Sequence, residues 1–347
     1  MVGQRFISLL ENHPWFEVAV VAASPRSAGK TYEAAVGDRW KMTTPMPEAV
    51  KNMIVLNVNE VEKVAERVDF VSSAVDMSKD EIKAIEEAYA KTETPVVSNN
   101  SAHRWTPDVP MVVPEINPEH YEIIPYQRKR LGTTKGFVAV KPNCSIQSYT
   151  PMLNAIMEFE PTVVVATTYQ AISGAGKTFK DWPEMVGNLI PYIGGEEEKS
   201  EKEPLRIWGH IENGVIVPAT TPVITTQCLR VPVLDGHTAA VFMNLNKKVS
   251  KEDIIEKWVS FSGEPQALNL PSAPKQFIQY LEDDDRPQVM LDKDFEHGMG
   301  VSVGRLRPDS VYDWKFVGLS HNTLRGAAGG GVLSAEMLVA KGYITKK

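Results

Sequence analysis

Short apolar runs alternate with amphipathic stretches through the first third of the chain. The apolar runs at 17–24, 69–74 and 95–100 are typical of buried strands. Residues 4–12 and 79–91 place apolar side chains at helical spacing and predict amphipathic helices. Because strands that alternate with helices indicate a parallel sheet, we expect an α/β fold in this part of the chain.

The pattern changes after residue 144, where the apolar runs become longer. Runs at 161–170, 220–233 and 237–246 predict long strands, and 252–260 is the one clear later helix. We therefore expect a mixed or antiparallel sheet in the second half.

The end of the chain, residues 322–342, predicts a long helix although it contains five glycines, from Gly326 to Gly342. The small residues from Gly326 to Gly331 would let this helix lie close to another element or to a ligand.

Composition and charge narrow the classes of function. A chain of 347 residues is expected to form two domains, and its 43% hydrophobic and 23% charged residues are typical of a globular protein. A net charge of −7 argues against a nucleic-acid partner, and no run approaches the length of a membrane span. The two cysteines lie 84 positions apart and no metal-ligand spacing occurs, so we expect no metal and a cytoplasmic, reducing location.

Cys144 lies where a predicted strand ends and helical spacing begins. The apolar run at 136–140 leads through Lys141-Pro142-Asn143 to the cysteine, and apolar residues then recur at helical spacing from Ile146 to Ile156. A helix N-terminus lowers the pKa of a thiol, which favours a nucleophile. A packed structural cysteine remains the alternative, and it is the preferred interpretation for Cys228.

His237 is the natural partner for Cys144. It opens a predicted strand after a bend, a position that holds a side chain at a cleft rather than submerged, and Arg230 lies before the same bend. Sequence alone does not bring Cys144 and His237 together, so a solvated or turn-capping histidine remains possible. The planar guanidinium of Arg230 could grip a carboxylate or form a structural ion pair.

Three further segments could contact a ligand. The glycine-containing loop at 169–176 could bring backbone N–H groups to a ligand or be a plain turn. The charge run at 194–203 is expected to begin a solvated helix, in which Glu196 and Lys199 could face a zwitterion. Arg104 follows a strand end, where α/β sheets collect ligands, although an exposed surface arginine is the simpler interpretation.

The residues after the run at 17–24 favour NADP if the fold binds a dinucleotide. Folds that select NAD usually place an acid there, whereas this chain has Ser24, Arg26 and Ser27, which suit a 2′-phosphate. Before the first helix, Met1-Val2-Gly3 resembles the end of a GxxGxxG phosphate loop, with an ordinary translation start as the alternative.

Five motifs, in order along the chain, resemble the aspartate-semialdehyde dehydrogenase family, in particular its archaeal and fungal-like branch. They are PNCS (142–145), YQAISGAG (169–176), IPYIGGEEEK (190–199), RVPVLDGH (230–237) and HNTLRGAAGGG (321–331). The likeness covers essentially the whole chain.

The resemblance implies a fold and an activity. The fold would be a Rossmann dinucleotide-binding domain (1–143, completed by 322–347) and a glyceraldehyde-3-phosphate-dehydrogenase-like α+β domain for catalysis and oligomerisation (144–321). The activity would be the NADPH-dependent reductive dephosphorylation of L-aspartyl-4-phosphate to L-aspartate 4-semialdehyde through a cysteine thioester, for lysine, threonine and methionine biosynthesis. The substrates would be aspartyl phosphate and phosphate, and the assembly a homodimer or homotetramer.

The resemblance also implies a role for each site residue. Cys144 would be the nucleophile and His237 the acid/base. The substrate would be bound by Arg230 at its α-carboxylate, Glu196 at its ammonium group, Gln170 at its acyl group, and Lys199, Arg104 and Asn143 at its phosphate. The residues expected to bind NADP are Gly3, Ser24, Arg26, Ser27, Ser73, Ser173, Gly174 and Asn322.

The N-terminus departs from the family, whose members begin with a strand and a complete GxxGxxG loop that would precede Met1. We expect the printed chain to be shortened there, because that strand lies at the centre of a Rossmann sheet. A natural protein of 38.5 kDa that binds NADPH normally would contradict this expectation.

Two other functions remain open at this point. An acyl-CoA reductase of the malonyl-CoA type shares the fold, but Asn143 and the Glu196/Lys199 pair favour an amino-acid phosphate; N-acetyl-glutamyl-phosphate reductase fits the cysteine context less well. A catalytically inactive nucleotide-binding regulator is the alternative from another class.

Overall fold

A computed structural model describes all residues from Met1 to Lys347. The first part of the chain forms the parallel strands that the alternation predicts. Two short parallel sheets result, β1 with β2 and β3 with β4 and β5. Their bounds are β1 Ala22–Ala23, β2 Leu56–Asn57, β3 Val71–Ser73, β4 Val96–Ser98 and β5 Val138–Val140.

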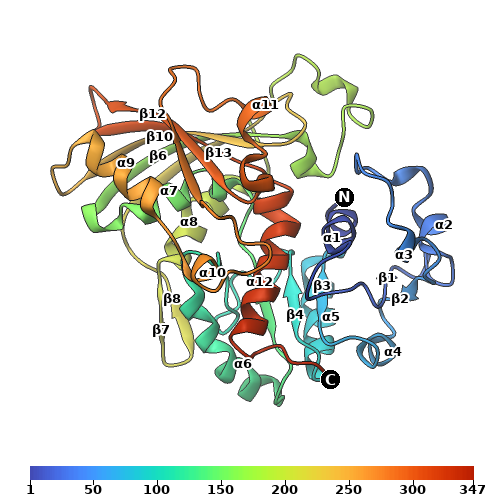
Figure 1. The fold of residues 1–347 in the computed structure, drawn as a ribbon. Helices are drawn as coiled ribbons and strands as arrows, with labels where there is room; N and C mark the ends of the chain where they lie inside the picture. Colours follow the sequence, from blue (N-terminus) through green and yellow to red (C-terminus); the bar gives the residue numbers. More distant parts are fainter.

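Helices connect and flank these strands (Figure 1). The helix predicted at 79–91 is confirmed as α5, and it begins at a capping box in which Ser78 and Glu81 bond each other's backbone N–H. The helices of this part are α1 Val2–Leu10, α2 Tyr32–Val36, α3 Glu48–Lys51, α4 Val61–Ala65, α5 Lys79–Lys91 and α6 Ile124–Leu131. None of the helices in the structure is long and apolar enough to cross a membrane.

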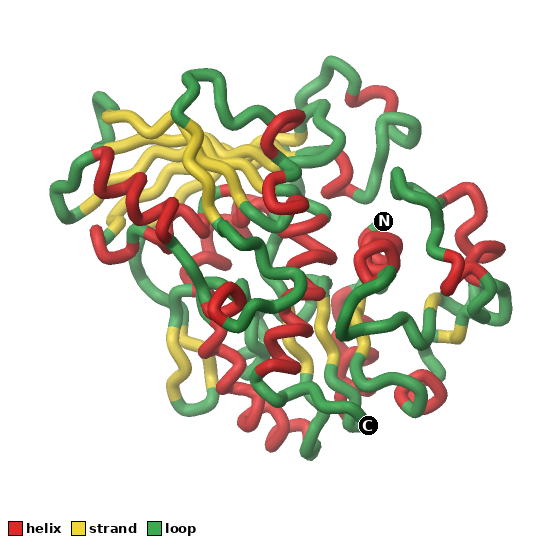
Figure 2. The backbone as a smooth tube through the Cα atoms, viewed as in Figure 1, coloured by secondary structure: helices red, strands yellow, loops and turns green.

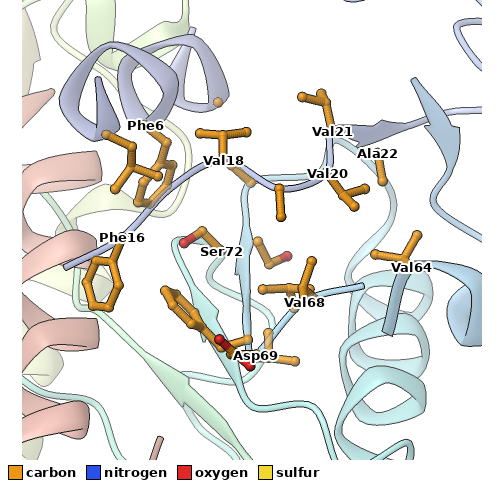
Figure 3. Close-up of a pocket in the computed structure, with 18 of the residues that line it drawn as sticks. Phe6, Phe16, Val18, Val20, Val21, Ala22, Val64, Val68, Asp69 and Ser72 are labelled. Carbon is orange, nitrogen blue, oxygen red and sulfur yellow. The ribbon is translucent and has the colours of Figure 1, made fainter. Parts of the chain in front are cut away.

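The strand predicted at 17–24 is much shorter than expected. Only Ala22 and Ala23 pair, and residues 17–21 run extended along one wall of a cavity of about 1170 Å³. Figure 3 shows Val18, Val20 and Ala22 on this wall, with Ser72 from β3 on the facing one.

Both walls of this cavity carry open strand edges. The carbonyl of Ala23 accepts a backbone hydrogen bond on the β2 side (2.9 Å), and that of Ser73 accepts one on the β4 side (2.9 Å). Because backbone groups alternate in direction along a strand, those of Ala22 and Ser72 point toward the cavity. The cavity therefore has the form of a slot between two sheets that a further strand could join, which explains why the 17–24 run pairs over so few residues.

The second part of the chain forms one mixed sheet with strand order β11-β12-β13-β10-β6-β9. Helices α7, α8 and α9 lie along one face of this sheet (Figures 1 and 2). The strands are β6 Pro161–Gln170, β9 Val223–Arg230, β10 His237–Leu245, β11 Ile278–Leu281, β12 Val301–Pro308 and β13 Trp314–Ser320. The helices are α7 Thr150–Ala155, α8 Glu196–Ile207, α9 Lys251–Ser260, α10 Glu264–Ala267 and α11 Val289–Asp292, and a small hairpin joins β7 His210–Glu212 to β8 Val215–Val217.

The C-terminal segment returns to the first part of the chain, as the resemblance implied, and it lies close to other elements, as its small residues predicted. A wide helical turn at Leu324–Ala328 leads into α12 (Gly329–Ala340), which packs against α1. Arg325 anchors the turn, because its buried guanidinium forms a two-pronged ion pair with Glu115 (2.5 and 2.8 Å). This places the glycine-rich turn directly behind the segment that carries Cys144.

Candidate active site

The structure brings Cys144 and His237 together. Cys144 follows the end of β5, and His237 is the first residue of β10. The Sγ atom of Cys144 lies 3.4 Å from Nε2 of His237. Two residues 93 positions apart in the chain therefore meet within hydrogen-bonding reach, the geometry that a thiol and its partner require.

The structure does not form the long helix that we expected directly after Cys144. A four-residue 3₁₀ helix, Ser145–Ser148, follows the cysteine, and α7 begins only at Thr150. The expected decrease in the thiol pKa by a long helix is therefore wrong. Burial raises the pKa of Cys144, Glu196 raises it further, and the positive charges of Lys141, Arg104 and Arg230 oppose this. Burial and Glu196 therefore favour the thiol over the thiolate, and the three positive charges act against them.

His237 is completely buried, so the expectation that it lies at an open cleft is wrong. The backbone N–H of Ala171 donates to its Nδ1 (3.0 Å), so the proton of the neutral ring lies on Nε2, facing Cys144. Burial lowers the pKa of His237 to about 3, and the charges of Arg230 and His321 add to this effect. As the fold holds it, His237 is a neutral hydrogen-bond donor toward the sulfur.

Four of the predicted substrate-binding residues meet at one carboxylate. Glu196 accepts hydrogen bonds from the amide of Asn143 (3.0 and 3.1 Å), the amide of Gln170 (3.3 Å) and the ammonium of Lys199 (2.8 Å). Burial raises the pKa of Glu196, but the charge of Lys199 and these hydrogen bonds lower it overall. The carboxylate therefore stays ionised beside Cys144.

The two predicted arginines have different surroundings. Arg230 donates to the carbonyl of Ala171 (2.7 Å) and has no acidic partner, so its guanidinium can take a ligand carboxylate. Arg104 is buried in an ion pair with Glu203 (2.9 Å) and donates to the carbonyl of Lys141 (3.1 Å). Among the guanidinium nitrogens of Arg104, only Nη2 has no hydrogen-bond acceptor in the protein, so Nη2 can donate to an anion.

The charge run at 194–203 was expected to be solvated, and this is wrong for one face of α8. Glu196, Ser200, Glu203 and Ile207 follow helical spacing and are all buried. Glu203 is completely buried, and its second oxygen accepts the backbone N–H of Asn143 (2.5 Å). Sequence analysis missed Glu203, although its spacing from Glu196 places both on one face.

The residues predicted to bind a dinucleotide lie in two groups. In the first group, Gly3 and Ser73 line the large cavity, and Ser24, Arg26 and Ser27 form the turn after β1. The side chain of Arg26 is exposed and has no acidic partner, so its charge is available to a phosphate.

The second group borders Cys144 and His237. The side-chain amide of Asn322 donates to the hydroxyl of Ser173 (2.8 Å), which fixes the loop that holds Gly174. A Cβ at Gly174 would lie 3.0 Å from Nη1 of Arg230 and 3.2 Å from Cε1 of His237. Glycine therefore keeps the space next to Arg230 and His237 open.

Two family models match the chain. The semialdehyde dehydrogenase NAD binding domain matches residues 1–124, and the semialdehyde dehydrogenase dimerisation domain matches residues 151–325. Cys144 lies in the short segment between the two matched ranges.

Named relatives and a solved structure match over nearly the full length. The aspartate-semialdehyde dehydrogenase of Methanothermobacter thermautotrophicus is 41% identical over 341 residues, 97% of this chain and 96% of the relative. That of Saccharomyces cerevisiae is 41% identical over 359 residues, 99% of this chain and 96% of the relative. The crystal structure of aspartate semialdehyde dehydrogenase with NADP from Candida albicans has a TM-score of 0.88 at 38% identity and covers 99% of this chain and 97% of that one.

Proposed function

The chain belongs to the aspartate-semialdehyde dehydrogenase family, and from this premise we propose the reaction and the role of each residue. The enzyme is an NADP-dependent oxidoreductase of the aspartate pathway, as the five motifs indicated. In the biosynthetic direction it reduces L-aspartyl-4-phosphate to L-aspartate 4-semialdehyde and releases phosphate. The observation that carries the proposal is the contact of Cys144 with His237 beside the Glu196 cluster.

Cys144 forms the covalent intermediate. Its thiolate attacks the acyl phosphate carbon, a C–S bond forms, and the bond to the phosphate oxygen breaks with its electrons on the phosphate. The leaving phosphate is bound by Lys199, Nη2 of Arg104 and the amide of Asn143, which lie at or beside the Glu196 cluster. Cationic and amide donors at this place stabilise the charge as it develops.

The remaining residues hold the amino-acid part and its carbonyl oxygen. Arg230, which has no acidic partner, binds the α-carboxylate, and Glu196 binds the ammonium group. Gln170 orients the acyl group. The Nε2–H of His237 donates to the carbonyl oxygen as negative charge develops on it, a role that fits its fixed Nδ1 acceptor. Nε2 could accept a proton only if the ring proton moved to Nδ1, and this would break the hydrogen bond from the backbone N–H of Ala171.

NADP is the cofactor of the family, and the residues present fit it. Arg26, Ser24 and Ser27 would bind its 2′-phosphate, Gly3 and Ser73 its central part, and Ser173, Gly174 and Asn322 would place the nicotinamide at Cys144. When bound, the reduced cofactor supplies the hydride that reduces the thioester.

The dimerisation-domain match indicates that this enzyme assembles with copies of itself. We place the boundaries of the NADP domain at 1–143 with 322–347 and those of the catalytic domain at 144–321, and propose a homodimer or homotetramer. Both cysteines are free, so we also propose a reducing compartment, the cytoplasm.

The reverse reaction tests the proposed function. Purified enzyme with L-aspartate 4-semialdehyde and phosphate should reduce NADP, which is followed by absorbance at 340 nm. We expect no reaction without phosphate and a slower one with NAD. Reduction of malonyl-CoA with NADPH, together with no phosphate-dependent reaction, would contradict the proposal and support the acyl-CoA reductase.

Arg230→Lys should weaken binding of the semialdehyde. Lysine keeps the charge but loses the planar two-pronged grip on a carboxylate, worth about 1.5–3 kcal/mol for a charged hydrogen bond. We therefore expect KM for the semialdehyde to rise about 10- to 100-fold in steady-state kinetics. The KM for phosphate, measured on the same variant, is the internal control. An unchanged KM for the semialdehyde would remove Arg230 from the substrate site.

A further inference from the structure

Lys141 is a buried lysine that no carboxylate neutralises. It lies between β5 and Cys144 and is 4% exposed, and no acidic group lies within ion-pair distance of its Nζ. The one hydrogen bond that Nζ makes goes to a neutral acceptor, the carbonyl of Pro142 (2.5 Å). Because an unpaired buried charge costs several kcal/mol, a lysine that only fills space would be a poor choice at this position.

Lys141 and Cys144 pack against the same helical segment. A Cβ at Gly326 would lie 2.7 Å from the Cβ of Cys144, and one at Gly330 would lie 4.0 Å from Cε of Lys141. Gly326 and Gly330 lie on either side of a kink at Ala327, in the turn that leads into α12. Lys141 and Cys144, three positions apart in the chain, therefore both border this glycine-rich turn.

The other charged groups near Lys141 are already engaged. Glu203 is bonded to Arg104, and Glu196 is bonded to Lys199. The charged and titratable groups that act on Lys141 are Arg104 on the loop after β4, Glu196 and Glu203 on α8, and Cys144 itself; Arg325, which shares a small cavity with Lys141, is paired with Glu115. Cys144 is thus the one group of this set that can supply an unshared negative charge.

His237 cannot supply the stabilising charge. Its ring is neutral and already carries a proton on Nε2, so it donates one hydrogen bond to the sulfur without a positive charge. We propose that Lys141 is a positioning residue whose buried ammonium group holds Cys144 as the thiolate. The inference rests on the proposed function, because it assigns how the nucleophile of that reaction is activated.

Burial opposes the charged forms of both groups, because it raises the pKa of Cys144 and lowers that of Lys141, and the attraction between the two charges acts against this effect. Burial lowers the pKa of Lys141 to about 7, and Arg104 adds to this, whereas the Cys144 thiolate raises it. Among the charges that lower the pKa of Cys144, that of Lys141 is the largest. Because each charge favours the other, the two groups should titrate as a linked pair.

The test is the pH dependence of Cys144 alkylation by iodoacetamide in full-length Lys141→Met, Lys141→Arg and unchanged enzyme. Methionine keeps the length of the stem but removes the charge, so the thiolate loses stabilisation and the apparent pKa of Cys144 rises. We expect alkylation at pH 7 to slow about tenfold and to approach the unchanged rate at high pH. Arginine should restore most of the rate at pH 7.

Thermal unfolding separates this role from a structural one. Lys141→Met should melt no lower than the unchanged enzyme, because an unpaired buried charge has been removed. An unshifted pH profile in a folded variant would overturn the proposal, and Lys141→Gln provides the same measurement if the methionine variant does not fold. If the proposed function itself is wrong, the outcome is different: Cys144 of the unchanged enzyme then reacts with iodoacetamide no faster than a free thiol.

Discussion

Cys144→Ala is expected to lower kcat for phosphate-dependent NADP reduction by at least about 10⁴-fold. The nucleophile forms the only covalent bond between enzyme and substrate in the proposed mechanism, and loss of such a residue in other enzymes costs about 10⁴- to 10⁶-fold. Stopped-flow and long-time absorbance assays at 340 nm can cover this range. Binding of NADPH, measured by fluorescence titration, should remain within about twofold, since alanine only removes the sulfur.

Cys228→Ala is the matched control, since Cys228 is the only other cysteine in the chain. Its side chain is completely buried in β9, with Sγ 3.6 Å from the hydroxyl of Ser200. Its loss should reduce the free energy of unfolding by about 1–2 kcal/mol and leave kcat unchanged. Equal losses of activity in the two variants would indicate a packing role for Cys144 and would favour the inactive regulator.

Iodoacetamide distinguishes the two cysteines in the unchanged enzyme. Peptide mass spectrometry should find Cys144 labelled first, and phosphate with semialdehyde should protect it. Labelling of Cys228 should require unfolding, because its sulfur has no access to solvent. A Cys144 that substrate does not protect would contradict its place in the substrate site.

Local patterns predicted the elements whose stabilising contacts are close in sequence. The 79–91 helix and the 161–170 strand have the bounds that periodicity gave, because a capping box and period-two burial are local properties. The 17–24 strand could not be predicted in the same way. Its length depends on a neighbouring edge, and in this structure the neighbour on one side is a cavity.

The segment after Cys144 illustrates a limit of periodicity. Ile146, Tyr149 and Leu153 are all buried, as helical spacing predicted, yet the backbone is not one continuous helix. Pro151 has no N–H to donate and clashes with the preceding turn, so a new helix begins beside it at Thr150. The pattern correctly predicted which side chains are buried, and Pro151 explains why the backbone does not form one continuous helix.

The residues that the motifs missed depend on partners far away in the chain. Glu203 bonds Arg104 across 99 positions, and a glutamate within a charge run gives no sign of such a partner. The tautomer of His237 is set by the backbone N–H of Ala171, a group that every residue except proline carries. The sequence contains one weak sign that Lys141 is unusual, because a charged residue directly follows a buried strand. Only the fold shows that it is unpaired.

His237 provides the second large effect, because the structure makes it a hydrogen-bond donor. His237→Ala should lower kcat about 10²- to 10³-fold, the cost of one donor to a developing oxyanion. His237→Gln, which carries an N–H donor but cannot act as a base near neutral pH, should recover about tenfold of that loss. Steady-state kinetics of the two variants measure the difference.

The pH profile gives an independent check on the same residue. The pKa of His237 is lowered to about 3, so the ring is neutral at every pH above about 4, and its donor bond is present throughout the working range. Any limb of the kcat/KM profile near pH 6–7 should therefore also be present in His237→Gln. If such a limb exists and is lost in this variant, and if glutamine restores nothing relative to alanine, His237 transfers a proton in the reaction. The Ala171 hydrogen bond would then have to break during turnover, because Nδ1 can carry a proton only when it no longer accepts one from the backbone.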